Sequence, residues 1–241
     1  ARLMEKGGMA ASVAGKIIEI LGEKRAVLAV LLGCGALTYG GLSVFVVAFV
    51  MYPFGAVVFK KADIPKRLLP AALWMGIFSF AMVAMPGTPQ IQNIIPSSYF
   101  GTSTWSGMGI GIFATLIFLF MGWAWISFRA KRLKAQGEGY GKHIEYSQRR
   151  HKIPNPDWKV SVIPLILVIV LNVFLSNPFH WDWAFHWDES SLESLAPMHI
   201  SLLAHSVAKI SAGWSITISL IISSIVAAII ARRHLRITEG M

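Results

Sequence analysis

Leu37-Thr38-Tyr39-Gly40-Gly41-Leu42-Ser43 interrupts an apolar stretch that runs from Ala26 to Phe59. The whole stretch is too long for one untilted membrane span of about 20 residues, whereas each arm beside the interruption has the length of a re-entrant segment. Irregular backbone at membrane depth is tolerated where it is buried in protein or lines a cavity. The pattern therefore predicts a re-entrant hairpin over residues 26–59, with its tip at 38–43.

The charges on either side of this stretch support the hairpin. Glu23-Lys24-Arg25 precedes it and the basic segment Lys60–Arg67 follows it. Because cytoplasmic loops collect Lys and Arg, both ends are expected in the cytoplasm, which a single crossing does not allow. A long tilted helix is the alternative interpretation.

A second interruption, Pro86-Gly87-Thr88-Pro89-Gln90-Ile91-Gln92-Asn93, follows the apolar residues Leu68–Met85. Proline lacks the backbone N–H of a regular helix and clashes with the preceding turn, so two prolines and a glycine end an unbroken helix. We predict a broken transmembrane helix over residues 68–101, with the break at 86–93. Its amide and hydroxyl side chains indicate a polar site. The alternative is that Leu68–Ala84 is the whole span and the break is an external loop.

The other segments follow from periodicity and charge. Met9, Val13, Ile17 and Leu21 recur every four residues, which predicts an amphipathic interfacial helix within residues 1–24. Apolar runs predict transmembrane helices over residues 105–128, 160–176 and 208–231. The segment 129–158 is basic and is predicted to be a cytoplasmic loop, whereas 177–207 is acidic and lacks Lys and Arg, so we expect it in the periplasm.

The composition indicates a protein dissolved in lipid. Apolar residues make up 55% of the 241 residues and charged residues 14%, against about 25% charged in soluble domains. We therefore predict an all-α polytopic protein of the bacterial inner membrane. The net charge of +10 lies in short segments beside apolar runs, so nucleic acid is not an expected partner. The chain begins with Ala1 and ends at Met241 after a basic stretch, and we expect further spans in the complete protein.

The two interruptions are the candidate site for an organic anion. Broken helices expose backbone N–H groups that can receive a carboxylate, and their amide and hydroxyl side chains can bind substrate hydroxyls. For a shared pocket, the tip and the break must lie together. The alternative is that both only permit close helix packing. The candidate substrate-binding residues are Thr38, Tyr39, Gly40, Gly41, Ser43, Gly87, Thr88, Gln90, Gln92 and Asn93.

These segments resemble the gluconate permease (GntP) family. The similarity is carried by Leu37–Ser43 and Met85–Asn93, and by Gly22-Glu23-Lys24-Arg25-Ala26 after the first helix. It runs through most of Ala1–Phe128 and is strongest at Pro86–Asn93. The resemblance implies the ion-transporter superfamily, with an inverted-repeat fold that has one re-entrant hairpin and one broken helix in each repeat. This chain would hold the N-terminal half, without the matching second repeat.

The same resemblance implies proton-coupled uptake of gluconate or a related hydroxy acid. The expected partners are a small organic anion, a coupling ion with the proton favoured over sodium, membrane lipid and a second copy in a homodimer. No enzyme activity, cofactor or metal is expected. The apolar stretches up to Phe128 contain no Asp, Glu or His, and Tyr39, with an ordinary pKa of about 10, is a poor proton shuttle. A non-transporting membrane scaffold or subunit is the alternative function.

Overall fold

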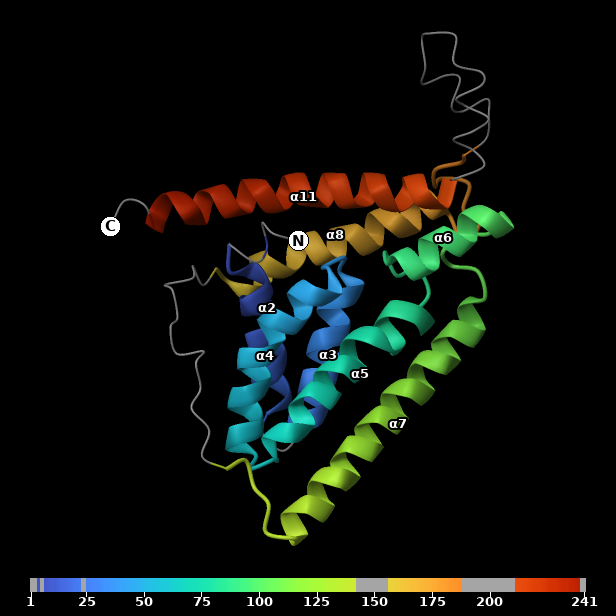
Figure 1. The fold of residues 1–241 in the computed structure, drawn as a ribbon. Helices are drawn as coiled ribbons and strands as arrows, with labels where there is room; N and C mark the ends of the chain where they lie inside the picture. Colours follow the sequence, from blue (N-terminus) through green and yellow to red (C-terminus); the bar gives the residue numbers. More distant parts are fainter. Residues whose placement is uncertain (1–3, 5–6, 23–24, 142–155, 188–210, 239–241) are drawn as a thin grey trace.

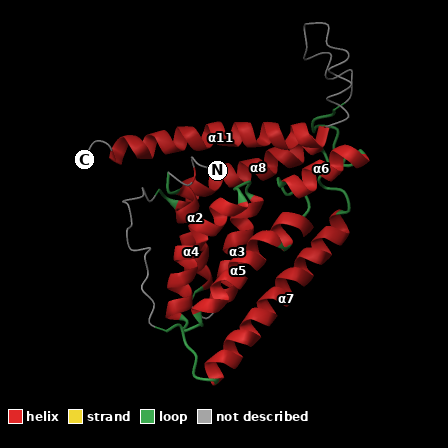
Figure 2. Ribbon diagram, viewed as in Figure 1, coloured by secondary structure: helices red, strands yellow, loops and turns green. Residues whose placement is uncertain are grey.

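The computed structural model describes residue 4 and residues 7–22, 25–141, 156–187 and 211–238. Within these ranges the chain is helical and has no strand (Figure 2). Five segments are long and apolar enough to cross a membrane: Val44–Lys61, Lys66–Ala84, Met108–Ala135, Trp158–Ser176 and Gly213–Arg232. The prediction of an all-α polytopic membrane protein is confirmed. The main helices, labelled in Figure 1, are α2 (Met9–Leu21), α3 (Ala26–Tyr39), α4 (Val44–Lys61), α5 (Leu69–Phe78), α6 (Ile91–Phe100), α7 (Met108–Ala135), α8 (Trp158–Ser176) and α11 (Ser211–Thr238).

Helices α3 and α4 form an antiparallel hairpin, and its tip lies next to α8 (Figure 1). The tip is shorter than predicted, because α3 continues through Tyr39. Three backbone bonds close its last turn, from Gly40 N to Ala36 O at 3.0 Å, from Gly41 N to Thr38 O at 3.1 Å and from Leu42 N to Leu37 O at 3.2 Å. Gly41 has a φ of 84°, a left-handed conformation that glycine adopts without steric cost. A re-entrant position in the membrane remains a prediction.

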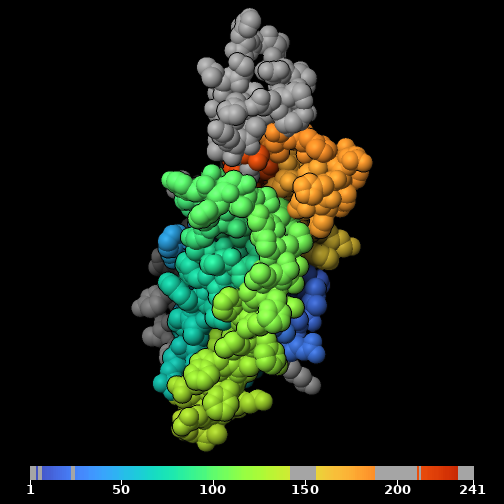
Figure 3. Space-filling model, turned by 90° about the vertical axis from the view of Figure 1, so that its right-hand side faces the viewer, coloured from blue at the N-terminus to red at the C-terminus, as the bar shows by residue number. Residues whose placement is uncertain are grey.

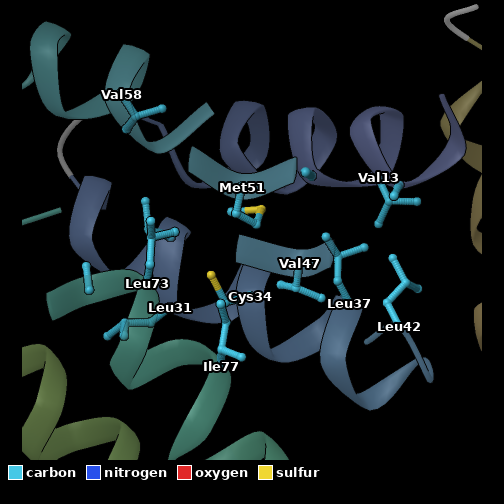
Figure 4. Packing of buried hydrophobic residues seen from close by; sticks show 14 of the residues in the cluster. Val13, Leu31, Cys34, Leu37, Leu42, Val47, Met51, Val58, Leu73 and Ile77 are labelled. Carbon is cyan, nitrogen blue, oxygen red and sulfur yellow. The ribbon is translucent and has the colours of Figure 1, made fainter. Parts of the chain in front are cut away.

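The core lies around α3 (Figure 4). Ten of the 14 residues of α3 are buried, so neighbouring helices surround it. Glycines let these helices approach closely. A Cβ on Gly76 of α5 would come within 2.7 Å of Cys34 Cβ, and one on Gly33 within 2.7 Å of the Met51 methyl group. Close backbone approach of this kind is typical of helix packing in membranes. There, helices associate through van der Waals contact, and small residues let the backbones come close.

The second interrupted helix is more irregular than predicted. Helix α5 ends at Phe78, a short π-helix follows over Phe80–Ala84, and the chain then leaves helical geometry until α6 begins at Ile91. The Ser79 hydroxyl donates to the Met75 carbonyl at the point where the helix changes its winding. The break therefore spans residues 85–90, and the last three residues of the predicted break are helical.

Helix α7 crosses one face of the molecule and leaves much of its apolar surface exposed (Figure 3). It begins at Met108, after a turn, and continues to Ala135. The first residues of the predicted basic loop are therefore helical, which is the difference expected when a helix extends beyond the lipid into water. Residues 142–155 of that loop lie outside the described part of the chain.

Ion pairs connect the end of α7 with the loop before α5. Lys134 Nζ lies 3.2 Å from Asp63 Oδ2, and Arg67 Nη2 lies 2.5 Å from Glu138 Oε2. The backbone N–H of Tyr140 also donates to Asp63 Oδ1 at 3.1 Å. This backbone bond, and then Lys134, hold the pKa of the Asp63 carboxyl below its usual range. The loop and the end of α7 therefore form one polar cluster.

Helices α8 and α11 lie side by side and antiparallel, across the tip of the hairpin (Figure 1). Small residues at every fourth position of α11 are all buried, and they allow close packing against α8. Helix α8 begins two residues before the predicted span, and α11 extends seven residues past it, to Thr238. The buried small residues are Ser215, Ser219, Ser223, Ala227 and Ala231.

Helix α2 begins at Met9, later than the predicted segment 1–24. Its buried face packs against α3, α4 and α8, and Ser12 Oγ donates to the Pro156 carbonyl at 2.6 Å. Its interfacial position remains a prediction. Of the predicted periplasmic loop 177–207, the structure describes only residues 177–187, where Trp181 and Trp183 stack with ring centroids 4.9 Å apart.

Candidate functional site: the junction of the hairpin tip and the helix break

The structure brings the hairpin tip and the helix break together, although they lie about 50 residues apart. Gln90 Nε2 donates to the Thr38 carbonyl at 3.0 Å and to the Leu42 carbonyl at 3.3 Å. In the opposite direction, the Tyr39 hydroxyl donates to the Pro86 carbonyl at 2.8 Å. Three side-chain bonds therefore join two segments of non-helical backbone. We call this region the tip–break junction, residues 38–43 and 85–93.

Two helix N-termini meet at the tip–break junction. Ser43 is the N-cap of α4 and Gln90 is the N-cap of α6, and neither helix has a side-chain cap. The first N–H groups of a helix have no partner within the helix and carry partial positive charge. Within the described residues, neither helix has an acidic side chain in its first turn. The junction therefore offers backbone N–H groups suited to an anion, beside the C-terminal ends of α3 and of the π-helix.

Hydrogen bonds inside the break hold its shape. The Thr88 hydroxyl is buried and donates to the Ala81 carbonyl at 2.9 Å. Asn93 Nδ2 donates to the Thr104 carbonyl at 3.0 Å and, more weakly, to the Thr88 carbonyl at 3.4 Å. The Thr104 carbonyl also accepts from Gly87 N at 2.9 Å. Thr88 and Asn93 therefore shape the break in this structure.

The glycines of the junction serve two different purposes. A Cβ on Gly40 would overlap Leu165 Cδ2, so this residue lets α8 approach the tip. For Gly40, the structure therefore agrees with the alternative interpretation that the interruption permits close helix packing. Gly41 approaches Pro89 of the break and Leu220 of α11. Gly87 has a φ of 71° and lies against the ring of Trp105, so it needs both the absence of a side chain and the left-handed backbone.

Two predicted residues take no part in these bonds. The side chains of Ser43 and Gln92 are exposed, and among the described residues neither makes a side-chain hydrogen bond. Their hydroxyl and amide groups are free to meet a ligand that approaches from outside the junction. Their role in substrate binding stays a prediction.

A small cavity of about 40 Å³ adjoins the tip. Gly40, Gly41 and Leu42 line it together with residues of α8 and α11, including Ser223. The volume exceeds the 10–15 Å³ or so that one water molecule requires. The tip therefore borders both the break and this cavity.

Sequence reasoning missed three residues that contact the break. Asn172 of α8 is buried, and its Nδ2 donates to the Gly87 carbonyl at 2.9 Å, while its Oδ1 accepts from Ser176 at 3.0 Å. Thr104 and Trp105 contact the break from the loop between α6 and α7. An amide inside an apolar span is itself a functional signal, which would have identified Asn172. Thr104 and Trp105 carry no comparable signal, because threonine and tryptophan are common at membrane interfaces.

These features define a polytopic membrane protein whose polar groups gather where two helices are interrupted. The chain matches the family model of the GntP family permeases over residues 1–207, and it belongs to that family. The resemblance found in the sequence is thereby confirmed. Membership of a permease family points to a transporter rather than an enzyme.

The chain is also similar to a curated bacterial protein. It is 35% identical to the "Uncharacterized transporter YxjC" of Bacillus subtilis (strain 168), over 100% of this chain and 52% of that protein. The chain therefore spans about half the length of the curated relative it matches. No solved structure matches the chain.

Proposed function

We propose that this chain forms one half of a secondary active transporter that carries gluconate or a related small hydroxy-carboxylate across the bacterial inner membrane. The tip–break junction would be one side of the substrate site. The observation that carries the proposal is the direct bonding of Gln90 to the Thr38 and Leu42 carbonyls, because it brings two helix N-termini to one place. Broken helices whose N-termini point at a substrate carboxylate are a recurring design of secondary transporters.

In the proposed site, the backbone and the side chains of the junction bind different parts of the substrate. The uncapped N–H groups at the start of α4 and α6 would receive the carboxylate. Gly41 and Gly87 let the backbone come close without a side chain in the way, as Gly40 does on the side of α8. The substrate hydroxyls would bind hydroxyl and amide side chains of the junction: Thr38, Ser43, Thr88, Gln90, Gln92 and Asn93.

The driving ion, the assembly and the location belong to the same proposal. We favour proton coupling over sodium coupling, and a homodimer, on the resemblance to gluconate permeases. Uptake into proteoliposomes separates the ions: an inward proton gradient should drive accumulation in sodium-free buffer, whereas a sodium gradient at equal pH should not. Accumulation driven only by sodium would reject proton coupling. Cross-linking of the purified protein tests for the homodimer, which should appear as a species of twice the mass of one chain.

The central test is uptake of labelled gluconate by the full-length protein in proteoliposomes. Asn93→Leu and Gly41→Ala should abolish uptake and leave membrane insertion intact, because both change the junction and not the apolar spans. Gly137→Ala is the matched control for Gly41→Ala. Gly137 has a φ of 82°, close to the 84° of Gly41, and no atom lies within 4 Å of the position that a Cβ would take, so the substitution leaves the site unchanged.

The results separate transport from the scaffold alternative. Wild-type protein that inserts correctly but takes up no hydroxy acid under either gradient would contradict transport of this substrate class. Normal uptake by both junction variants would instead show that the substrate site lies elsewhere in the protein.

A further inference from the structure

Unpartnered polar groups lie in and beside the tip–break junction. Among the described residues, four buried side-chain nitrogen or oxygen atoms have no hydrogen-bond partner: Thr38 Oγ1, Thr104 Oγ1, Trp105 Nε1 and Ser223 Oγ. Thr38 belongs to the tip, and Ser223 lines the cavity beside it. Thr104 and Trp105 lie against the break. Buried polar groups in native proteins are almost always paired, so a cluster of exceptions points to a missing partner.

Trp105 lies directly on the break. A Cβ on Gly87 would overlap Cζ2 of the Trp105 ring and Cε2, the ring carbon bonded to Nε1. The unpartnered N–H is therefore one bond away from an atom that packs on Gly87. The neighbouring Thr104 is 2% exposed, and its carbonyl is already occupied by Gly87 and Asn93. Its hydroxyl remains without a partner.

The chemistry of the indole decides which kind of ligand fits. An indole N–H donates a hydrogen bond and accepts none, so its partner has to be an acceptor atom. A cation is excluded as that partner. A threonine hydroxyl both donates and accepts, and it can bind the same ligand through either function. Together the two groups suit an oxygen-rich small molecule.

We infer that Trp105 and Thr104 are substrate-binding residues, in which the Trp105 indole N–H and the Thr104 hydroxyl bind oxygen atoms of the transported hydroxy-carboxylate at the break. The inference rests on the proposed function. It adds to the proposed substrate site two residues that the sequence did not indicate. Binding through a donor buried against Gly87 requires the ring to move aside as the substrate enters. Gly101 and Gly107 border the loop that carries both residues, and no atom lies within 4 Å of a Cβ position on either. Glycine adopts positive and negative φ about equally well, so the backbone angles at these two positions can change at little steric cost.

The test is concentration-dependent gluconate uptake by the full-length protein in proteoliposomes. Trp105→Phe keeps an aromatic ring but removes the indole N–H together with part of the ring volume, and Thr104→Val keeps the shape and replaces the hydroxyl with a methyl group. Each should raise KM about ten-fold with little change in kcat, the effect of losing one hydrogen bond to a charged or polar ligand. Trp123→Phe is the control for the ring, because Trp123 lies on the exposed face of α7. Thr115→Val is the control for the hydroxyl, because Thr115 Oγ1 already donates to the Gly111 carbonyl at 2.8 Å.

A second measurement does not depend on a variant that folds. In wild-type protein labelled with ¹⁵N-tryptophan, the Trp105 indole resonance should shift on saturation with gluconate, and the Trp123 resonance should stay in place. An unchanged KM in both variants, or an unshifted Trp105 resonance, would overturn the inference and assign these groups to ordered water. Absence of uptake by wild-type protein is a different result, because it rejects the proposed function itself.

Discussion

The tip–break junction and the serines of α11 both place polar side chains inside an apolar molecule, and their hydrogen bonds differ in range. In α11, Ser215 and Ser219 donate to carbonyls four residues back in their own helix, at 2.8 Å and 2.7 Å, and Ser215 also reaches the Leu175 carbonyl of α8 at 3.2 Å. At the junction, Gln90 and Tyr39 donate to carbonyls about 50 residues away. Ser215 and Ser219 of α11 therefore rely mainly on their own helix, whereas Gln90 and Tyr39 of the interrupted helices hold separate segments together.

The difference follows from what an interruption does to the backbone. A continuous helix pairs its own N–H and C=O groups, and a serine needs only the carbonyl one turn away. A broken helix leaves backbone groups that must find partners elsewhere, because lipid offers none. Long-range bonds are therefore concentrated at the two interruptions, and changes there should disturb function more than changes in the α11 seam. Substitutions in the two regions, and one outside both, test this comparison.

Among these substitutions, the largest effect is expected for Gly87→Ala. The added methyl group would meet the Trp105 ring and would also occupy a left-handed backbone conformation, a strain of about 1–3 kcal/mol. Displacement of the break by even 1 Å or so should reduce uptake about 100-fold or more, as misplacement does at other precise sites. Gly137→Ala is the control, since Gly137 has a φ of 82° in open space. Equal uptake by the two variants would show that the break tolerates movement.

A smaller loss is expected for Gln90→Met. Methionine fills the same space but donates no hydrogen bond, so the tip and the break lose two of their three side-chain bonds. We expect a cost of about 2 kcal/mol, equivalent to about a 30-fold fall in uptake. The same change at exposed Gln92 should leave thermal stability unchanged. A raised KM in Gln92→Met without loss of stability would support direct contact with substrate, and an unchanged KM would remove Gln92 from the site.

Asn172→Leu should have an intermediate effect and directly compares the two regions. It removes the bond to the Gly87 carbonyl while keeping the volume of the side chain. We expect a loss of about 1–1.5 kcal/mol and about a ten-fold fall in uptake. Ser219→Ala, in the locally satisfied seam, should change uptake less than two-fold or so, because only a bond within one helix is lost. A larger effect at Ser219 than at Asn172 would reverse the comparison.

The smallest effect is expected for Asp63→Asn, in the polar cluster at the end of α7. Because the pKa of Asp63 is lower in the folded protein than its ordinary value of 3.8, the ionised carboxylate stabilises the fold above that value. The contribution is lost as the pH falls through the lowered pKa. Asp63→Asn should therefore reduce the melting temperature slightly at pH 7 and not at all in strong acid. A difference that grew in acid would contradict this assignment.

The architecture could be predicted wherever local chemistry decides it. Paired glycines at 40–41 and two prolines at 86 and 89 break helices whatever surrounds them, and apolar length defines the spans. The predicted loop at 129–158 was placed too early, because hydropathy marks where lipid ends and not where the helix ends. The π-helix over Phe80–Ala84 was missed for a similar reason, since its sequence is as apolar as that of α5.

The junction itself was only partly predictable. The residues that form it were identified because they interrupt apolar runs, but their partners depend on packing between distant segments. Nothing local in the sequence indicates that Gln90 faces Thr38, or that Trp105 covers Gly87. Gly40 illustrates the same limit, since its contact with Leu165 comes from a helix more than 100 residues later.

The single amide of Asn172 that reaches the break has a mechanical consequence. If α8 slides along its axis by one turn, about 5.4 Å, a residue four positions away takes its place opposite the Gly87 carbonyl. In one direction that residue is Ser176, which still offers a donor, and in the other it is Val168, which offers none. A one-turn shift of α8 in the first direction would therefore replace one hydrogen bond to the Gly87 carbonyl with another. A shift in the opposite direction would leave this carbonyl without a donor.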